Sequence, residues 1–450
     1  MYKFKRVYAF LLVLMTFGIV KIPIVVANDS TETHVKECWS YARCVEYAKS
    51  NNIKLQQSIL TKESGLVSLE AAKAKWFPTL DASVSQGFTN YPRPEDGVRN
   101  NRYSGSYGLN AGWTVYDGGN RENSIKRSKI ENEINDLAIQ EIHNNLETEI
   151  LSYYLQILYS KEAIGIAKQS LEVSKMQLDR AKQLLSAGKI SKVDCTQLES
   201  QYNSDLYNLV SAESNYKTNV LNLKRLLELG IDTELSLDSL SFSSADVLQP
   251  VASKKDIYTS AIAWLPEFQS SRLQADVSEL DIAIAKSGVR PKISLNGSVG
   301  TGNASGTKYN FGNQLLNNLN EHVGITFSVP IFDNKSNKSA VAKAKIEKLN
   351  TLLEHRDLEN TLAQSIESTY IEAVNNQAKY RSGLVQLESA ELTDELTNEQ
   401  FKLGMVNTLD LLTSHNKLLN ARQELLQSKY MAILSIKMLD FYQNKGITLP

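Results

Sequence analysis

The sequence is poor in the residue types that mark nucleic-acid binding, disulfide frameworks and metal sites. Its 49 lysines and arginines are balanced by 50 aspartates and glutamates, so no basic excess favours nucleic acid. Three cysteines in 450 residues are too few for a disulfide scaffold. The five histidines are scattered without metal-ligand spacing, and we find no nucleophile motif and no glycine-rich phosphate loop. These absences argue against an enzyme and against a bound cofactor or metal.

The three cysteines are Cys38, Cys44 and Cys195. Cys38 and Cys44 lie six residues apart, and on a helix their side chains would point in different directions. We interpret the cysteines as small apolar packing residues. Whether Cys38 and Cys44 pair stays open from the sequence.

One strongly apolar run is present, VYAFLLVLMTFGIV at residues 7–20. Basic residues precede it, and Ala27 ends a stretch of small residues that suits signal cleavage. A run this short with this flank is typical of a secretory signal peptide rather than of a spanning helix. We therefore predict a signal peptide over residues 1–27 and a secreted mature chain.

The remaining chain contains one pattern twice. An ungapped offset of 216 residues superimposes 107–227 on 323–443, so that Gly188 falls on Gly404 and Asp194 on Asp410. An offset of 213 aligns the segments before them. The separation exceeds the period of about 20–50 residues that solenoids use. We therefore predict two structural repeats within one chain.

Each predicted repeat has the same order: a helix, a β-hairpin, a long helix and a last helix. In the first repeat, residues 28–229, these elements span 42–77, 79–116, 118–187 and 190–229. In the second repeat, residues 256–443, they span 256–290, 292–332, 334–403 and 406–443. Residues 230–255, which include a serine- and aspartate-rich stretch without a helical period, form a linker, and 444–450 form a C-terminal tail.

The hairpin segments alternate strictly between apolar and small polar residues. In 103–116 and 322–331 every second residue is apolar or aromatic, glycine apart, and its neighbours are mostly serine, threonine, asparagine or glycine. A half-buried soluble sheet also alternates, but matched pairs of such strands in a secreted chain favour a membrane β-barrel. Four strands cannot close a barrel, and lipid forbids open edges. Three copies of the chain would supply twelve strands.

The helices predict a second shared structure. A helix of roughly 70 residues is about 105 Å long, and the two shorter helices of a repeat sum to the same length, so they can stack end to end beside it. The last helix carries two apolar stripes, which indicates neighbours on both sides, as in a ring of coiled-coil helices. The stripes are Leu411, Leu418, Leu425, Ala432 and Leu439, and Leu412, Leu419, Leu426 and Ile433.

Six short motifs carry a family resemblance. They are WFPTLDASVSQG at 76–87, VRPKISLNGSVG at 289–300, VYDGG at 115–119, PIFDN at 330–334 and the two glycine hairpins at Gly188 and Gly404. Ordered twice along a secreted chain, they resemble the TolC-type outer-membrane efflux proteins over nearly the whole mature sequence. One departure is that Asn334-Lys335 replaces the glycine pair of the second strand-to-helix junction.

The resemblance implies an α+β membrane protein that works as a homotrimer. It implies a twelve-stranded barrel in the outer membrane of a Gram-negative bacterium and a long α-helical coiled-coil barrel in the periplasm. Such a channel passively conducts substrates from an inner-membrane pump of the RND or ABC class, through a periplasmic adaptor, to the cell exterior. Drug or metal efflux and type I protein secretion stay open, as does the substrate. The alternative is a periplasmic coiled-coil adaptor or structural protein, which would share the signal peptide and long helices but would not need four strands.

The resemblance also implies that the two glycine hairpins form the periplasmic end of the channel. A glycine permits the left-handed conformation that ends a helix. Exposed apolar residues beside it favour a protein partner. We therefore predict an adaptor-docking surface on the two hairpin tips, formed by Gly188, Lys189, Ile190, Gly404, Met405 and Val406.

We predict a pore constriction at Asp410, Thr413 and Asp194. Asp194 and Asp410 each lie six residues past a hairpin glycine, so a trimer would hold two sets of three carboxylates, which favour cations and can raise one another's pKa. By resemblance, Asp410 and Thr413 match the two positions of the family's constriction ring. The alternative for Asp194 is a carboxylate that stabilises a helix start.

The family's tyrosine and arginine latch positions hold Phe401 and Val406 here. The charged latch of the family is therefore replaced, and a looser or apolar closure is the hypothesis for this chain.

Overall fold

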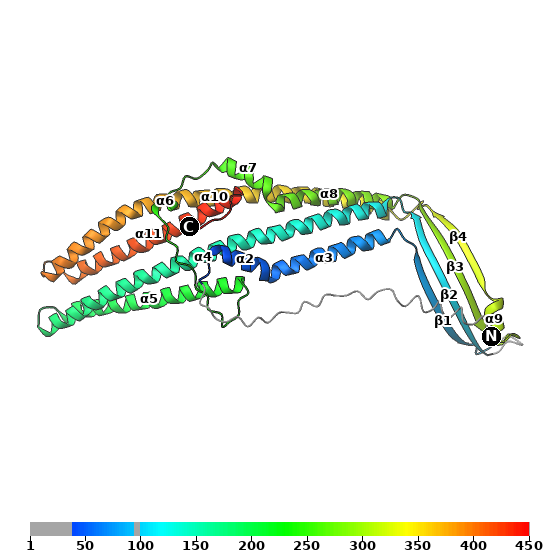
Figure 1. Cartoon of the computed structure of the whole chain (residues 1–450), viewed down its shortest axis with the longest axis horizontal. Helices are drawn as coiled ribbons and strands as arrows, with labels where there is room; N and C mark the ends of the chain where they lie inside the picture. Colours follow the sequence, from blue (N-terminus) through cyan, green and yellow to red (C-terminus); the bar gives the residue numbers. More distant parts are fainter. Residues whose placement is uncertain (1–37, 94–99, 450) are drawn as a thin grey trace. The chain divides into compact units, whose positions relative to one another are not determined.

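The computed structural model describes residues 38–93 and 100–449. The predicted signal peptide lies outside these residues. In the first half of the described chain the elements are α2 Tyr41–Asn51, α3 Ile53–Ala74, β1 Thr79–Asn90, β2 Asn101–Tyr116, α4 Asn120–Ser186 and α5 Lys192–Leu226 (Figure 1). In the second half they are α6 Ser244–Val247, α7 Lys254–Trp264, α8 Pro266–Ser287, β3 Lys292–Ala304, α9 Phe311–Asn317, β4 Asn320–Ser328, α10 Ser336–Lys402 and α11 Thr408–Tyr442.

Corresponding helices of the two halves have equal lengths. The long helices α4 and α10 have 67 residues each, and α5 and α11 have 35 each. The helices before the strands also match, because α2 and α7 have 11 residues and α3 and α8 have 22. The two halves therefore divide their chain in the same proportions.

The single helix predicted before each hairpin is wrong, because each is divided in two. Asn52 separates α2 from α3, and its side chain accepts a hydrogen bond from the Leu55 amide at 3.2 Å, which caps α3. In the second half Leu265 separates α7 from α8, and Pro266 is the first residue of α8. Proline disfavours helix in the residue before it and suits the first helical turn, so Pro266 marks this break in the sequence.

The four strands form one antiparallel sheet in the order β1-β2-β3-β4. Leu80 pairs with Ala111, Leu109 with Val299, and Leu295 with Ile325, so the apolar positions of all four strands share one face. The opposite face carries small polar residues, as where Gly112 pairs with Thr79 and Asn296. The apolar face is solvent-exposed in the single chain, with large exposed side chains at Leu80, Val84, Phe88, Leu109, Val299, Val323, Ile325 and Phe327.

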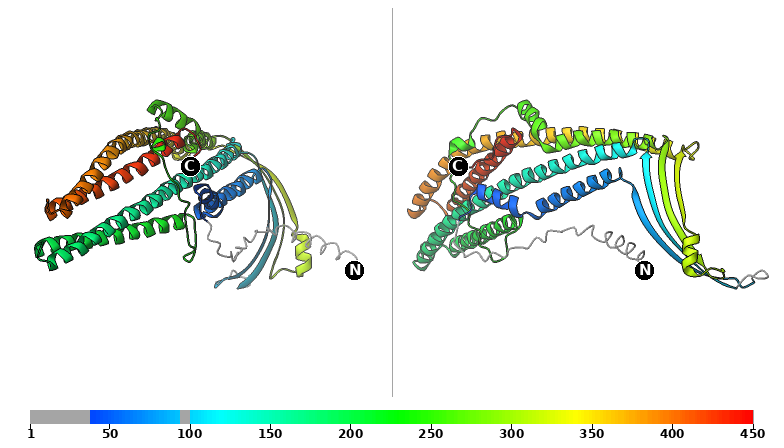
Figure 2. Two further views of the ribbon diagram at one scale, coloured as in Figure 1. Left: turned by 60° about the vertical axis from the view of Figure 1, so that its left-hand side comes forward. Right: turned by 45° about the vertical axis from the view of Figure 1, so that its right-hand side comes forward.

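Each long helix pairs with the helix that follows it, α4 with α5 and α10 with α11, and the two pairs form two helical hairpins (Figures 1 and 2). The helix α11 also packs against α4, which joins the two helical hairpins. The largest apolar cluster includes fully buried Tyr154 of α4 and Leu223 of α5 together with Ile433 of α11. Tyr154 donates a hydrogen bond to the carbonyl oxygen of Trp39 at 3.2 Å, and Cys44 and Ala48 of α2 are buried in the same cluster.

The segment predicted as a linker contributes to this core. Leu235, Leu237, Phe242 and Val247 are buried in the largest cluster, and Val247 lies in the short helix α6. Two of its polar residues act as caps, since Ser243 and Asp246 form a reciprocal capping box at α6. The composition of residues 230–255 therefore did not predict that part of this segment packs in the core.

Among residues 38–93 and 100–449, no helix combines the length and the apolar content that crossing a membrane requires.

Candidate functional site

The two hairpins end in turns of the same geometry, which we name the first tip (residues 186–194) and the second tip (residues 402–410). Gly188 has φ +69° and Gly404 has φ +73°, the left-handed conformation that glycine adopts without strain. The amide after each glycine reaches back five residues, from Lys189 to the Leu184 carbonyl and from Met405 to the Gln400 carbonyl, each at 2.9 Å. Both helices therefore end in the hydrogen-bonded motif that the glycine positions predict.

The helix that follows each tip is capped differently. At the first tip the Ser191 hydroxyl accepts from the Asp194 amide at 3.1 Å and donates to the Asp194 carboxylate at 2.6 Å. The same carboxylate accepts from the Ser191 amide at 3.3 Å, which completes a capping box. At the second tip the Asn407 side chain accepts from the Asp410 amide at 2.8 Å, and the structure gives no reciprocal bond to the Asp410 carboxylate within the described chain.

The two aspartates therefore differ in their surroundings. Asp194 is half-buried, and hydrogen bonds from Ser191 and then from Thr408 of the second tip hold the pKa of its carboxyl below the ordinary value. Asp410 and Thr413 are exposed on one face of α11. The Thr413 hydroxyl donates to the Leu409 carbonyl oxygen at 2.7 Å, so the helix itself satisfies it.

The docking residues predicted from the sequence are exposed to different degrees. Lys189 and Met405 are exposed, the latter at 69 %, whereas Ile190 and Val406 are half-buried. Sequence reasoning missed three exposed apolar side chains beside them, Val193, Leu403 and Leu409. Val193 and Leu409 are related by the offset of 216 residues, so the repeat contained a signal that could have found this pair.

An apolar cluster joins the two tips. Cys195 of α5 and Leu411 of α11 are buried together, and Phe401 and Ile190 pack against this cluster. Cys195 is therefore a packing residue, as predicted, and Phe401 makes an apolar contact with this cluster. The Cys38 and Cys44 thiols, whose pairing was open, are both free in the structure, and Cys44 is buried.

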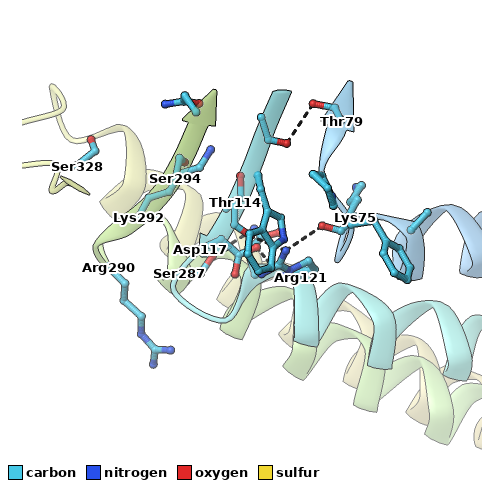
Figure 3. Close-up of a pocket in the computed structure, with 18 of the residues that line it drawn as sticks. Lys75, Thr79, Thr114, Asp117, Arg121, Ser287, Arg290, Lys292, Ser294 and Ser328 are labelled. Atoms are coloured by element: carbon cyan, nitrogen blue, oxygen red, sulfur yellow. Dashed lines mark hydrogen bonds between the residues drawn. The ribbon is translucent and has the colours of Figure 1, made fainter. Parts of the chain in front are cut away.

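A second site lies where the strands meet the helices. A cavity of about 960 Å³ is lined by the polar ends of the strands and by residues of α3, α4 and α8 (Figure 3). Arg121 is buried there, and its guanidinium donates to the carbonyl oxygens of Lys75 and Thr114, each at 2.8 Å, and stacks 4.0 Å from the Trp76 ring centroid. These bonds fix the β-hairpin formed by β1 and β2 to the start of α4. The sequence gave no signal for Arg121, because its equivalent under the offset is Asn337.

The turn from β2 into α4 explains the glycine pair of this junction. Gly118 has φ +73°, and a Cβ atom added there would lie 2.8 Å from the Ser287 carbonyl oxygen. In the second half Asn334 and Lys335 adopt the same left-handed region, with φ 53° and 65°. Asp117 and Asp333 accept hydrogen bonds from amides of the first helical turn, at 3.0 Å and 2.8 Å to Arg121 and Asn337. Both aspartates therefore stabilise the first turn of the long helix that follows them.

The tips and the sheet offer contact surfaces and charged groups. Among the described residues no group of three histidine, cysteine, aspartate or glutamate side chains is placed to hold a metal ion. The tips offer apolar contact surface and one exposed carboxylate, and the sheet offers one apolar and one polar face. Such features suit assembly with other surfaces.

Comparisons with known proteins agree with this arrangement. The model of the outer membrane efflux protein family matches residues 45–228 and 257–439. The outer membrane protein TolC of Escherichia coli is 22 % identical over 404 residues, which cover 87 % of this chain and 79 % of that protein. The alkaline protease secretion protein AprF of Pseudomonas aeruginosa is 23 % identical over 306 residues, 66 % of this chain and 61 % of AprF. The crystal structure of CusC superimposes with a TM-score of 0.76 at 16 % identity, covering 93 % of this chain and 96 % of that one.

The matched segments fall on the two halves that the sequence repeat predicted, and together they span most of the chain. The alternative of a periplasmic coiled-coil adaptor or structural protein is therefore wrong. The chain belongs to the outer membrane efflux protein family and is an outer-membrane channel of an efflux or type I secretion system of a Gram-negative bacterium, with its long helices on the periplasmic side.

Proposed function

We propose that three copies of the chain build one channel, each giving four strands to a twelve-stranded barrel. Two features of the single sheet support closure with other copies. Its outer strands β1 and β4 each have one unpaired edge within the described residues, and lipid makes such an edge costly. Its exposed apolar face carries Val84, Val323 and Ile325, which a barrel would turn toward lipid, while the small polar face would line the lumen.

We further propose that the chain is a two-fold structural repeat, so that three chains supply six helical hairpins to one periplasmic barrel. The equal helix lengths of the two halves and the two family matches support it. Exposed apolar residues along α10, such as Leu349, Leu353 and Val385, give the surface for a neighbouring copy. An isolated chain would leave this surface in water, at about 25 cal/mol for each Å² of apolar area.

The tips are the proposed docking surface for a periplasmic adaptor, which connects the channel to an RND or ABC pump. Exposed Met405, Leu403, Leu409 and Val193 support a protein partner at this end. Lys189 adds a positive charge at the first tip. Gly188 and Gly404 set the turn geometry that presents these side chains, and half-buried Ile190 and Val406 pack behind them.

The proposed pore constriction lies at the start of α11. Asp410 and Thr413 are exposed on the same helical face, so three copies would give a ring of carboxylates above a ring of hydroxyls. We include Asp194 in the proposed constriction. Its carboxylate is engaged in the Ser191 cap and is therefore less available to a passing ion. Closure at Phe401 would be apolar, since that side chain packs on the cluster around Leu411.

The stoichiometry and the barrel have a common test. Native mass spectrometry of the protein extracted from outer membranes should give three chains, and electrophoresis without boiling should give a folded species whose mobility changes on heating. A salt-extractable monomer without heat-modifiable mobility would contradict the proposed trimer. The observation that carries the proposal is the four-stranded sheet with an exposed apolar face and two open edges.

A further inference from the structure

The cavity at the strand-to-helix junction lies on the polar face of the sheet. Lys292 of β3 pairs with Ser328 of β4, and alternation places it on the same face as Ser294 and Asn296. All four residues line the cavity of about 960 Å³ (Figure 3). In the proposed barrel this face lines the lumen, so the cavity would open onto the path of a passing solute.

The wall of this cavity carries an excess of positive charge. Its lining includes four cationic side chains and one carboxylate, which are Lys75, Arg121, Arg290 and Lys292, and Asp117. Within residues 38–93 and 100–449, none of the four cations forms an ion pair with a carboxylate. The lining therefore has three more positive charges than negative ones.

The one lining carboxylate is engaged by the backbone. Asp117 accepts a hydrogen bond through Oδ1 from the Gly119 amide at 3.2 Å and through Oδ2 from the Arg121 amide at 3.0 Å. Both oxygens therefore serve the first turn of α4, where a carboxylate is favourable. Asp117 does not pair with the lysines of the cavity.

Arg121 adds a buried charge behind the cavity wall. Only 5 % of this residue is exposed. Its terminal nitrogens donate to the carbonyl oxygens of Lys75, Thr114 and Val115, and its Nε atom has no hydrogen-bond partner within the described chain. Carbonyl oxygens carry only partial charge, so a buried guanidinium without a carboxylate leaves a positive potential at the cavity.

Two lysines present their charge to the cavity. Lys75, at the end of α3, and Lys292, at the start of β3, are both exposed. Arg290 also lines the cavity, but its guanidinium donates to the Gly118 carbonyl oxygen at 2.8 Å and its side chain extends away from the strands (Figure 3). Lys75 and Lys292 are therefore the cations that a solute in the cavity can contact.

Neutral hydrogen-bonding groups surround these lysines. The hydroxyls of Thr79, Ser294 and Ser328 and the side-chain amide of Asn296 line the same cavity. Hydroxyl, amide and ammonium groups can all donate to the oxygens of a carboxylate, phosphate or sulfonate. Pockets for drug-sized ligands occupy about 300–1,000 Å³, so the cavity has room for an organic molecule.

We propose that this cavity is a binding site for organic solutes that carry an anionic group. Lys75 and Lys292 attract the anionic group, and the hydroxyls beside them donate to its oxygens. The site lies within one chain, whereas its place on the lumen rests on the proposed function. The proposal therefore assigns a class of solute to the channel.

Fluorescence anisotropy of pyranine, a fluorescent organic trisulfonate, tests the proposal on the full-length protein in detergent. The wild type should bind pyranine saturably, and affinity should fall as the salt concentration rises, because ions screen the lysines. Lys75→Gln and Lys292→Gln should each weaken binding about fivefold, the effect of one unit charge at about 4 Å in water. Lys292→Arg keeps the charge and should bind pyranine within about twofold of the wild type.

Lys182→Gln is the matched control. Lys182 is exposed near the other end of α4 and does not line the cavity, so its loss changes the net charge equally and should leave binding unchanged. Equal weakening in Lys182→Gln and Lys292→Gln would show attraction by net charge alone and overturns the proposal. Absence of saturable binding to the wild type overturns it too, as does unchanged affinity in both cavity variants.

Native mass spectrometry of the same samples separates this inference from the proposed trimer. A trimer whose pyranine binding does not depend on Lys75 and Lys292 overturns the site and leaves the channel proposal standing. A monomer with lysine-dependent binding supports the site and contradicts the trimer. Because both lysines are exposed, neither variant removes a buried side chain, and if one variant does not fold the other carries the test.

Discussion

The two hairpin tips have the same backbone and the same sequence register, yet they use their aspartates differently. Each tip has a left-handed glycine, an N-cap residue three positions later and an aspartate three positions after that. At the first tip, Ser191 and Asp194 bond reciprocally. At the second tip, Asn407 caps the helix through its side-chain oxygen alone and Asp410 stays exposed.

The serine cap of the first tip holds the Asp194 carboxylate, whereas the asparagine cap of the second tip leaves the Asp410 carboxylate exposed. A serine hydroxyl accepts one hydrogen bond and donates another, so it can hold both an amide and a carboxylate. The asparagine oxygen accepts from the amide, and among the described residues no hydrogen bond runs from the Asn407 side chain to the Asp410 carboxylate. The repeat therefore specifies where an aspartate lies, and its cap partner specifies what the aspartate can do.

Replacing the left-handed glycine that the two tips share should give the largest effect on stability. Alanine in the left-handed conformation costs about 1–2 kcal/mol, so Gly188→Ala and Gly404→Ala should each lower the free energy of unfolding by that amount. Gly165→Ala is the control: that glycine lies inside α4 with open space beside it, and alanine there should stabilise by up to about 1 kcal/mol. Denaturant midpoints of the three variants measure this, and a loss confined to one tip would show that the turns are not equivalent.

Alanine substitutions of the two aspartates should lower the free energy of unfolding by different amounts. Asp194→Ala removes a capping box and should lower the free energy of unfolding by about 1 kcal/mol. Asp410→Ala removes only the interaction of a first-turn carboxylate with the helix dipole, about 0.3–0.5 kcal/mol at an exposed site. Parallel unfolding curves compare the pair directly. Equal losses would mean that the reciprocal bond at Ser191 contributes nothing.

The smallest expected effect is a pH dependence of the first tip. The pKa of Asp194 is lowered in the folded chain, so its contribution is present above the ordinary carboxyl pKa, about 3.9, and is lost as the pH falls through the lowered value. Ser191→Ala removes the main cause of the lowering. The stability gap between wild type and Ser191→Ala should therefore narrow from about pH 6 to about pH 3. A gap that widens in acid would reverse the assigned sign.

Much of the fold was predictable because it depends on strong local patterns. Strict alternation predicted four strands, and the glycines at positions 188 and 404 predicted where the long helices end. The break at Pro266 was equally local, and we missed it because helical periodicity continues across it. The break at Asn52 depends on a side-chain cap that composition does not mark.

The site was less predictable, because the features that distinguish its residues arise from contacts between distant segments. Phe401 meets the cluster around Cys195 and Leu411 only when the two hairpins lie side by side. Lys75 and Lys292 line one cavity, although more than two hundred residues separate them in the sequence. Arg121 has no counterpart in the second half, so the repeat gave no reason to expect it.

The most direct test of the account is the ion selectivity of the channel in planar bilayers. Reversal potentials in a salt gradient should show that Asp410→Asn lowers the preference for cations, because each chain loses the one exposed tip carboxylate that faces no cap. Asp194→Asn should lower it less, since that carboxylate is engaged by Ser191. A cation preference unchanged in Asp410→Asn, or a larger loss in Asp194→Asn, would contradict the assignment of the second tip as the pore constriction.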